Sequence, residues 1–153
     1  MLIIDHIGVV VKSMDEGIEL WKTVFNYDQL THIVVNTRQK VRVVFLTKNN
    51  SLQVKLIEPV DATSPVYAFA QRGGGLHHLC FRCSKLDEEI SRLGVLGLRV
   101  LVEPQPGEAF ENENIAFLFA KQGLNIELVD TNKRAGIIKF LDHQAVGGQV
   151  AGA

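Results

Sequence analysis

The stretch Gly75-Leu76-His77-His78-Leu79-Cys80-Phe81 decides the fold, because it has a counterpart near the start of the chain. It is a short apolar run with two histidines at its head. Ile4-Asp5-His6-Ile7-Gly8-Val9 has the same arrangement of a hydrophobic residue, a polar residue, a histidine and a β-prone run. His6 and His78 are 72 residues apart.

The same offset of 72 residues relates further segments. It superimposes Phe45-Leu46 on Phe117-Leu118, and Leu52-Gln53-Val54-Lys55-Leu56 on Leu124-Asn125-Ile126-Glu127-Leu128. One offset shared by several segments, with no gap between them, indicates a duplicated unit. The sequence therefore predicts two copies of one fold, in which a lysine of the first copy is equivalent to a glutamate of the second.

Each copy has the pattern of a β-α-β-β-β module. In the first copy, Ser13 and Glu16 have the spacing of a capping box, so a helix is expected to start there. In the second copy, Ser84 is the expected cap and Gly94 the expected end, because glycine takes the left-handed conformation without strain. The expected strands cover residues 2–11, 29–36, 41–47 and 51–58, and then 76–82, 98–103, 114–120 and 124–130, with a loop at 104–112.

These elements predict an α+β fold of two βαβββ modules in tandem, at residues 2–60 and 76–131. Residues 61–75 are expected to join the modules through a short helix, capped by Ser64, and a glycine hinge. Residues 132–153 fall outside the repeat as a C-terminal tail. Within that tail, residues 135–143 are a candidate short helix.

Asn49-Asn50 is a suitable two-residue hairpin turn, because asparagine tolerates positive φ. With that turn, Val44 would pair opposite Lys55, and Arg42 opposite Ile57. Side chains alternate between the two faces of a strand. Arg42 and Val44 are therefore expected on the sheet face that carries Lys55.

Equivalent positions converge if the two copies pack about a pseudo-two-fold axis. His6, Lys55, His78 and Glu127 would then share one concave site. Two histidines and a carboxylate are the ligands of a facial triad, which leaves other positions on a metal open to water or substrate. The alternative for each histidine is a core residue with satisfied hydrogen bonds. His77, one residue out of step, is expected to face the other way.

The composition is ordinary for a globular protein, with 153 residues, 46% of them hydrophobic, and a net charge of −1. The near-zero charge argues against nucleic acid or an anionic membrane surface as a partner. No apolar run approaches the length of a membrane span. The first residues lack the basic region of a signal peptide, so a cytoplasmic protein is expected.

Cys80 and Cys83 have C-x-x-C spacing, which is found in redox pairs and in halves of zinc sites. They lie in or beside a predicted strand, where residues three apart point to opposite faces. Reduced thiols that help to fill the core are therefore the favoured interpretation.

The chain resembles the vicinal oxygen chelate superfamily, which includes glyoxalases, extradiol dioxygenases, bleomycin- and fosfomycin-resistance proteins and methylmalonyl-CoA epimerases. The likeness is greatest to the epimerases and covers residues 2–130. It rests on Asp5-His6-Ile7-Gly8-Val9-Val10-Val11, Leu56-Ile57-Glu58-Pro59, Ser64-Pro65, Gly75-Leu76-His77-His78 and Ile126-Glu127-Leu128.

The resemblance implies paired βαβββ modules around a metal site whose ligands match His6, His78 and Glu127. The implied cofactor is a divalent metal: Zn, Co, Mn, Ni or Fe. Two positions depart from the family pattern. Lys55 stands where the epimerases have a Gln or Glu that completes the metal shell, and a protonated lysine cannot bind a metal. Arg42 aligns with a glutamate base, and arginine is not a usable base at neutral pH.

The favoured function is a metal-dependent small-molecule enzyme of the isomerase, epimerase or lyase class. It would stabilise the enolate of an anionic or acyl-CoA-like substrate. Glu127 and Lys55 are the candidate catalytic residues, while Arg42 and Lys55 would bind the negative charge of the substrate.

Three alternatives remain open. One is a metal-free small-molecule or antibiotic-binding protein, in which Lys55 pairs with Glu127 in place of the metal. The second is a ferrous facial-triad dioxygenase, and the third is a structural module without a working site. Members of the family are often dimers, so a homodimer is the expected assembly by analogy.

Overall fold

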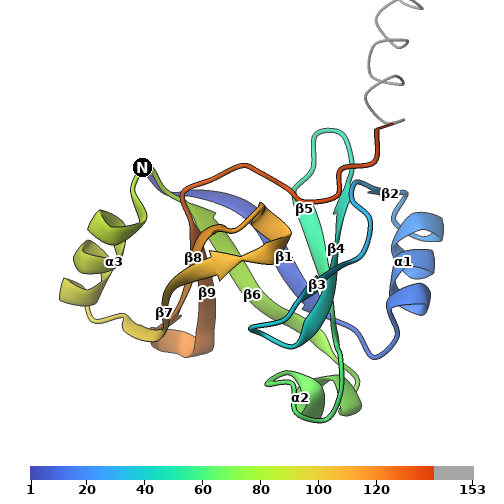
Figure 1. The fold of residues 1–153 in the computed structure, drawn as a ribbon, viewed down its shortest axis with the longest axis horizontal. Helices are drawn as coiled ribbons and strands as arrows, with labels where there is room; N and C mark the ends of the chain where they lie inside the picture. Colours follow the sequence, from blue (N-terminus) through green and yellow to red (C-terminus); the bar gives the residue numbers. More distant parts are fainter. Residues whose placement is uncertain (140–153) are drawn as a thin grey trace, which may run out of the picture.

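The computed structural model describes residues 1–139, which form one continuous curved sheet with three helices (Figure 1). The sheet has nine strands in the order β2-β4-β5-β1-β6-β9-β8-β7, and β3 also pairs with β4. The strands are β1 (Ile3–Val10), β2 (Asp28–Gln29), β3 (Val34–Asn36), β4 (Val41–Thr47), β5 (Gln53–Pro59), β6 (Gly75–Arg82), β7 (Arg99–Gly107), β8 (Glu113–Ala120) and β9 (Leu124–Val129). The helices are α1 (Met14–Thr23), α2 (Tyr67–Gln71) and α3 (Leu86–Val95), with short 3-10 turns η1 (Glu108–Phe110) and η2 (Lys121–Gly123).

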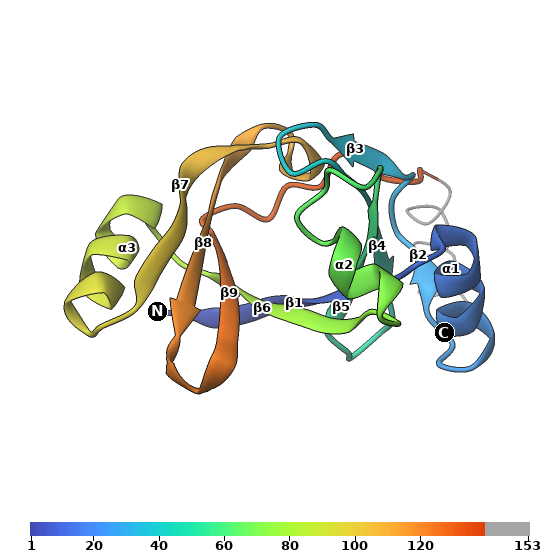
Figure 2. The same ribbon diagram turned by 90° about the horizontal axis from the view of Figure 1, so that it is seen from below.

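The predicted α+β fold of two βαβββ modules is confirmed. Strand β1 pairs in parallel with β5 of its own module, and β6 pairs in parallel with β9 in the same way. The modules meet where β1 and β6 pair antiparallel at the centre of the sheet. Helices α1 and α3 lie at opposite ends of the molecule, one for each module (Figure 2).

Three apolar clusters hold the sheet and helices together. One lies under α1 and contains Met14 and Leu56, while another lies under α3 and contains Leu86 and Leu128. The third fills the space between the modules and includes Phe45, Phe110, Val10 and Val129. Burial of large apolar side chains of this kind is the main stabilising term of a fold of this size. No helix within residues 1–139 is long and apolar enough to cross a membrane.

The predicted register of the β4–β5 hairpin is wrong by one residue. Phe45 lies opposite Lys55, and Arg42 lies opposite Glu58. The strands end at Thr47 and resume at Gln53, so the connection is a five-residue loop and not a two-residue turn. Because a shift of one residue moves every side chain of a strand to the other face, the whole set of neighbours of Lys55 changes.

The start of α1 is as predicted, because the Ser13 side chain accepts a hydrogen bond from the Glu16 backbone N–H. The predicted cap of α3 is wrong. That helix begins after Lys85, and the Asp130 carboxylate, not Ser84, accepts a hydrogen bond from the Leu86 N–H at 3.1 Å.

The repeat explains the unexpected cap of α3. In the first module the Met14 N–H donates to the carboxylate of Glu58, which is the repeat equivalent of Asp130. Each helix is therefore capped by the acid at the end of the last strand of its own module. The end of α3 also differs from the prediction, because Gly97 and not Gly94 has the positive φ expected after a helix.

Three further predicted elements are corrected. The predicted strand 29–36 is split into β2 and β3, and the predicted loop 104–112 is in part the end of β7, whose pairing with β8 carries two register shifts. Helix α2 begins after Val66 and not at Ser64.

The segment after β9 crosses from the second module back to the first (Figure 1). Its backbone is held by hydrogen bonds from Ala135 N to Ala109 O and from Ile138 N to Leu30 O, both 2.9 Å long. Ile137 forms a bridge with Thr31, which explains why the predicted strand there is interrupted. Residues 135–139 are not helical, and the rest of the candidate helix at 135–143 lies outside the described residues.

Candidate functional site

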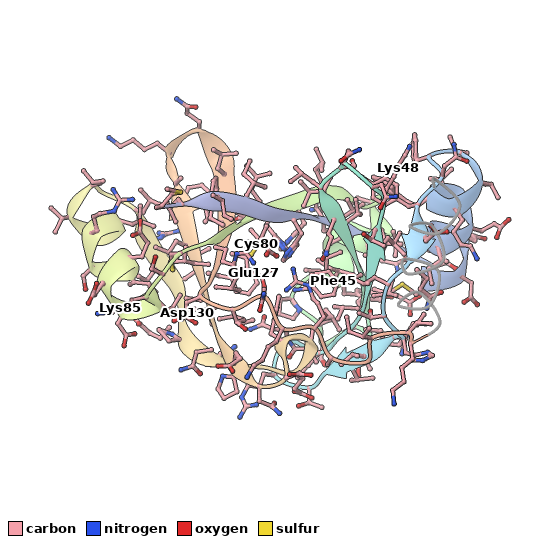
Figure 3. All side chains as sticks on the ribbon, turned by 90° about the horizontal axis from the view of Figure 1, so that it is seen from above. Phe45, Lys48, Cys80, Lys85, Glu127 and Asp130 are labelled. Carbon is pink, nitrogen blue, oxygen red and sulfur yellow. The ribbon has the colours of Figure 1, made fainter. Side chains whose placement is uncertain are left out.

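The structure brings His6, Lys55, His78 and Glu127 together, each from a different strand. Their positions on β1, β5, β6 and β9 lie around the seam between the modules. Glu127 lies near the centre of the molecule, close to Cys80 and between the ends that carry α1 and α3 (Figure 3). His6 and Glu127 are fully buried, and Lys55 and His78 are each 5% exposed.

Glu127 is the centre of this cluster. Its carboxylate oxygens lie 3.2 and 3.3 Å from Lys55 Nζ. One of them, Oε2, is 2.7 Å from His78 Nε2 and 3.4 Å from His6 Nε2. A buried charge is costly unless it is paired, so the buried ammonium and carboxylate each require the other.

The Nε2 atoms of both histidines face Glu127 without a hydrogen bond. The distances are short, but neither nitrogen has a partner with hydrogen-bond geometry among the described residues. The other ring nitrogens are engaged, because His6 Nδ1 contacts the Asp5 carboxylate at 2.8 Å and His78 Nδ1 contacts His77 Nδ1 at 2.9 Å. Two histidine nitrogens and a carboxylate that converge in this way are donor atoms that could hold a cation.

The buried charges shift the protonation of the cluster. Burial alone would raise the pKa of Glu127, but the Lys55 ammonium, with His78 and His6 beside it, holds that pKa well below its ordinary value. Burial lowers the pKa of His78 to about 4, although Glu127 acts in the opposite direction. At neutral pH the cluster therefore contains an ionised Glu127 and a neutral His78.

Gly8 makes room for the ring of His78. The two residues pair across the β1–β6 seam, and a Cβ at Gly8 would lie 2.2 Å from the His78 ring. No side chain fits at that distance, so glycine is required for the observed position of the ring. The repeat equivalent of Gly8 is Cys80, which pairs with His6.

A pocket opens beside the cluster. It encloses about 390 Å³, part of it open to solvent, and its lining includes Lys55, His77 and His78 together with Val43 and Phe117. This volume lies within the range for small-molecule sites. Lys55 and His78 face the pocket, while Glu127 lies behind them. A ligand in this pocket would therefore meet the ammonium first.

Arg42 does not reach the site, contrary to the prediction. The corrected register puts it on the opposite sheet face, where its Nε donates to the Glu58 carboxylate at 2.7 Å. The residues of β4 that line the pocket are Val41 and Val43. His77 was expected to face away, but it contacts His78 and lines the pocket.

Arg134 and Asp5 belong to the site and were not predicted. Arg134 lies in the tail, outside the repeat, so the offset of 72 residues gave no sign of it. Its guanidinium pairs with Asp5 and lies 4.3 Å from the centre of the Phe45 ring. The one signal for Asp5 was its position next to His6, since metal-binding histidines are commonly held by a carboxylate.

The two cysteines lie in different apolar clusters. Cys80 is buried between the modules, whereas Cys83 is buried in the cluster beneath α3. Burial raises the pKa of both thiols, to about 11 for Cys83 and well above the ordinary value for Cys80. Thiolate is the reactive form, so burial and raised pKa values favour the interpretation of both residues as core side chains.

The donor atoms of His6, His78 and Glu127 fit a metal ion, because all three lie within 4.8 Å of one another and two of them are unpartnered. The Lys55 ammonium does not fit next to such an ion. At about 4 Å from a divalent ion it would be repelled by roughly 8 kcal/mol at an effective dielectric constant of about 20. A metal and the observed position of Lys55 therefore exclude each other.

Comparison with known proteins identifies the family. The family model for the glyoxalase/bleomycin resistance protein/dioxygenase superfamily matches residues 5–117. The uncharacterized protein YqjC of Bacillus subtilis (strain 168) is 32% identical over 130 residues, which is 83% of this chain and 91% of that protein. The mitochondrial methylmalonyl-CoA epimerase of Dictyostelium discoideum is 25% identical over 129 residues, which is 82% of this chain and 76% of the epimerase.

Solved structures agree with the sequence relatives. The crystal structure of methylmalonyl-CoA epimerase from Mycobacterium tuberculosis superimposes with a TM-score of 0.74 and 31% identity, and the match covers 91% of each chain. The hypothetical protein BH1468 from Bacillus halodurans C-125 superimposes with a TM-score of 0.77 and 26% identity, over 88% of this chain and 97% of that one. Sequence and fold together show that this chain belongs to the glyoxalase/bleomycin resistance protein/dioxygenase superfamily.

Proposed function

We propose that this protein is a small-molecule enzyme of the isomerase or lyase class that forms an enolate from an anionic, acyl-CoA-like substrate. The observation that carries the proposal is the arrangement of Lys55 and Glu127. A buried ammonium faces an apolar pocket, and a fully buried carboxylate lies directly behind it. Buried ionisable pairs in a pocket are a frequent mark of a catalytic site.

Lys55 is proposed to stabilise the enolate. Removal of a proton next to a thioester carbonyl places negative charge on the carbonyl oxygen. An ammonium at about 4 Å from that oxygen would contribute roughly 4 kcal/mol at an effective dielectric constant of about 20. Stabilisation of the charge that develops in the transition state is usually the largest single contribution to catalysis.

Glu127 is proposed to accept the proton. It is the carboxylate that contacts Lys55. When Glu127 takes the proton, its negative charge is lost and a negative charge forms on the enolate, which would also lie beside Lys55. To reach the substrate, Glu127 requires Lys55 to move aside from the 3.2 Å contact. The low pKa of Glu127 makes it a weak base until that contact is broken.

The pocket supports proton transfer on one face of the substrate. An epimerase with two bases needs an acid–base group on each side of the reacting carbon. The pocket-lining residues of β4 are Val41 and Val43, and the described lining of the pocket contains no carboxylate. We therefore favour an isomerisation or elimination with Glu127 as the one carboxylate base over an epimerisation with two carboxylates. His77, which also lines the pocket, is a further group that could carry a proton.

Relatives support the class of substrate. Several are methylmalonyl-CoA epimerases, and solved structures of such enzymes include complexes with 2-nitronate-propionyl-CoA and with methylmalonyl-CoA and ammonium. An acyl thioester with an acidic α-carbon is the substrate class that these relatives share.

A metal-dependent enzyme is the second candidate, favoured by the two unpartnered histidine nitrogens. His6, His78 and Glu127 would hold the divalent ion, whether Zn, Co, Mn, Ni or Fe. The bound ion would supply a Lewis acid for the same carbonyl group. Lys55 would then have to leave Glu127 and point into the pocket, where it could still bind an anionic substrate.

Exchange of α-protons for deuterium tests the proposal. The protein is incubated with propionyl-CoA or methylmalonyl-CoA in D₂O, and deuterium incorporation is measured by mass spectrometry. We expect exchange above the buffer rate, with a decrease of about 100-fold in Lys55→Met and Glu127→Gln. Arg42→Gln removes a positive charge on the opposite face and is expected to leave the rate unchanged.

Two results would count against the proposal. Exchange that persists in both Lys55→Met and Glu127→Gln would place the chemistry elsewhere. Thermal stabilisation by an acyl-CoA without any exchange would instead indicate a metal-free binding protein.

A further inference from the structure

Arg134 reaches the site from outside the repeat. It lies in the segment after β9 and is only 7% exposed. Its guanidinium pairs with the Asp5 carboxylate, and its Nε donates to the Gln53 side-chain oxygen at 3.2 Å. The aromatic rings of Phe45 and Phe110 lie against the same group, with ring centres 4.3 and 5.2 Å away. Charge, hydrogen bonds and stacking therefore fix this side chain in one place.

Asp5 connects Arg134 to His6. The carboxylate of Asp5 accepts from Arg134 and lies 2.8 Å from His6 Nδ1. A carboxylate at Nδ1 favours the tautomer in which Nδ1 carries the proton. The lone pair of Nε2 then faces Glu127. His78 has no such carboxylate, because the repeat equivalent of Asp5 is His77.

The Asp5 side chain is itself buried, with an exposed fraction of 5%. A buried carboxylate is costly unless it is paired, so its position depends on the partners that contact it. Arg82 is the other cation near Asp5, but it lies 3.9 Å away and is partly exposed. Arg134 is therefore the cation in direct contact with Asp5, and this contact holds the Asp5 carboxylate against the ring of His6.

We infer that Arg134 is a positioning residue: it holds the side chain of Asp5 against His6 Nδ1, and this contact fixes His6 in its Nδ1–H tautomer with Nε2 directed at Glu127. The inference concerns the same site as the proposed function, but it stands on these contacts and does not require the proposed reaction. A segment added after the duplicated modules thus completes a site that lies within the repeat.

The tail does not depend on Arg134 alone for its attachment. Its backbone is held by the hydrogen bonds of Ala135 and Ile138, and by a third from His32 N to Gly136 O at 2.8 Å. Lys133 pairs with Glu113 on the surface of the second module. Loss of the Arg134 side chain should therefore leave the tail in place, so its effect on His6 can be measured in a folded protein.

Nitrogen NMR of ¹⁵N-histidine-labelled, metal-free protein tests the inference, because Nδ1 and Nε2 shifts report the tautomer directly. The spectra are recorded at a pH where a free imidazole is neutral. We expect His6 in the wild-type protein to be mainly Nδ1–H. In Arg134→Met the fraction in that form should fall clearly, while the signals of His78 stay unchanged. Lys133→Met, a change of the same kind one residue earlier, should have no effect on either histidine.

Two further variants make the outcome decisive. Arg134→Lys keeps a charge but loses the two-sided contact with Asp5 and Gln53, so partial recovery is expected. Asp5→Leu removes the acceptor at Nδ1 with little change in volume and should shift His6 in the same way as Arg134→Met, even if Arg134→Met fails to fold. An unchanged His6 tautomer in either folded Arg134→Met or folded Asp5→Leu would overturn the inference.

Zinc affinity provides a second readout that does not depend on catalysis. Removal of a group that orients a metal-binding histidine typically weakens metal binding about 10- to 100-fold. In a Lys55→Gln background, which lacks the competing ammonium, Arg134→Met is expected to weaken zinc binding to that extent in calorimetry. Lys133→Met in the same background should leave the affinity unchanged. Equal affinities for the Arg134→Met and Lys133→Met proteins would contradict the positioning role.

Discussion

At the scale of single residues, His78 is held neutral by the core that surrounds it. Burial lowers its pKa from 6.5 to about 4. The unfolded chain therefore takes up a proton at this residue before the folded protein does. A folded-state pKa below the unfolded value means that stability is full at high pH and falls as the pH decreases through the window between the two values.

As the pH falls from 6.5 to the range where carboxylates titrate, we expect protonation of His78 in the unfolded chain to lower the free energy of unfolding by about 2 to 3 kcal/mol. At pH values below the ordinary pKa of a glutamate, the depressed pKa of Glu127 in the folded protein causes a further loss of stability as the pH falls. Urea unfolding of metal-free protein at several pH values measures the effect. His78→Asn should reduce the dependence of the free energy of unfolding on pH just below pH 6.5. An equal dependence in both proteins would show that His78 is protonated in the folded protein.

The four residues of the cluster could be predicted from the sequence because the repeat relates them by a constant offset. His6 corresponds to His78 and Lys55 to Glu127, so any packing about a two-fold axis brings them together. Arg42 was misplaced for a local reason. The sequence between β4 and β5 fits a two-residue turn, but the observed five-residue loop shifts the register and reverses the face. Arg134 has no repeat counterpart and was therefore missed.

At the scale of secondary structure, the helix ends show how tertiary contacts replace local signals. Ser13 caps α1 as expected, and the Glu58 carboxylate also accepts from the first turn of that helix. In the second module the local signal of Ser84 is not used. The Asp130 carboxylate, 44 residues away in sequence, takes the role, which no local pattern could show.

Asp130→Ala is expected to destabilise the protein by about 1 kcal/mol, because the Leu86 N–H would lose its partner and the helix its N-terminal negative charge. Ser84→Ala is the matched control and should change stability by less than about 0.5 kcal/mol. Chemical denaturation of both variants measures the difference. If Ser84→Ala were the more damaging change, the serine would be the cap and the assignment of Asp130 would fail.

At the scale of the whole molecule, the seam between the modules is the site. The sheet is continuous through β1 and β6, and the tail crosses from β9 to the first module. The Lys55–Glu127 pair joins β5 of one module to β9 of the other. Duplication placed two equivalent side chains at the axis, and their opposite charges allow both to be buried together.

This arrangement makes Lys55 the residue that determines the cation of the site. Its ammonium lies 3.2 Å from the carboxylate that a metal would need. Replacement by glutamine removes the repelling charge and offers an oxygen ligand instead. His6, His78 and Glu127 would then converge on a cation without competition.

Titration calorimetry of the wild-type protein and Lys55→Gln with zinc, cobalt and manganese tests this account most directly. We predict that the substitution strengthens divalent binding at least about tenfold, or roughly 1.4 kcal/mol. Glu127→Ala in the same background should abolish the gain. Equal, tight binding by the wild-type protein and Lys55→Gln would contradict the account, because it would show that Lys55 already lies clear of an open three-ligand metal centre.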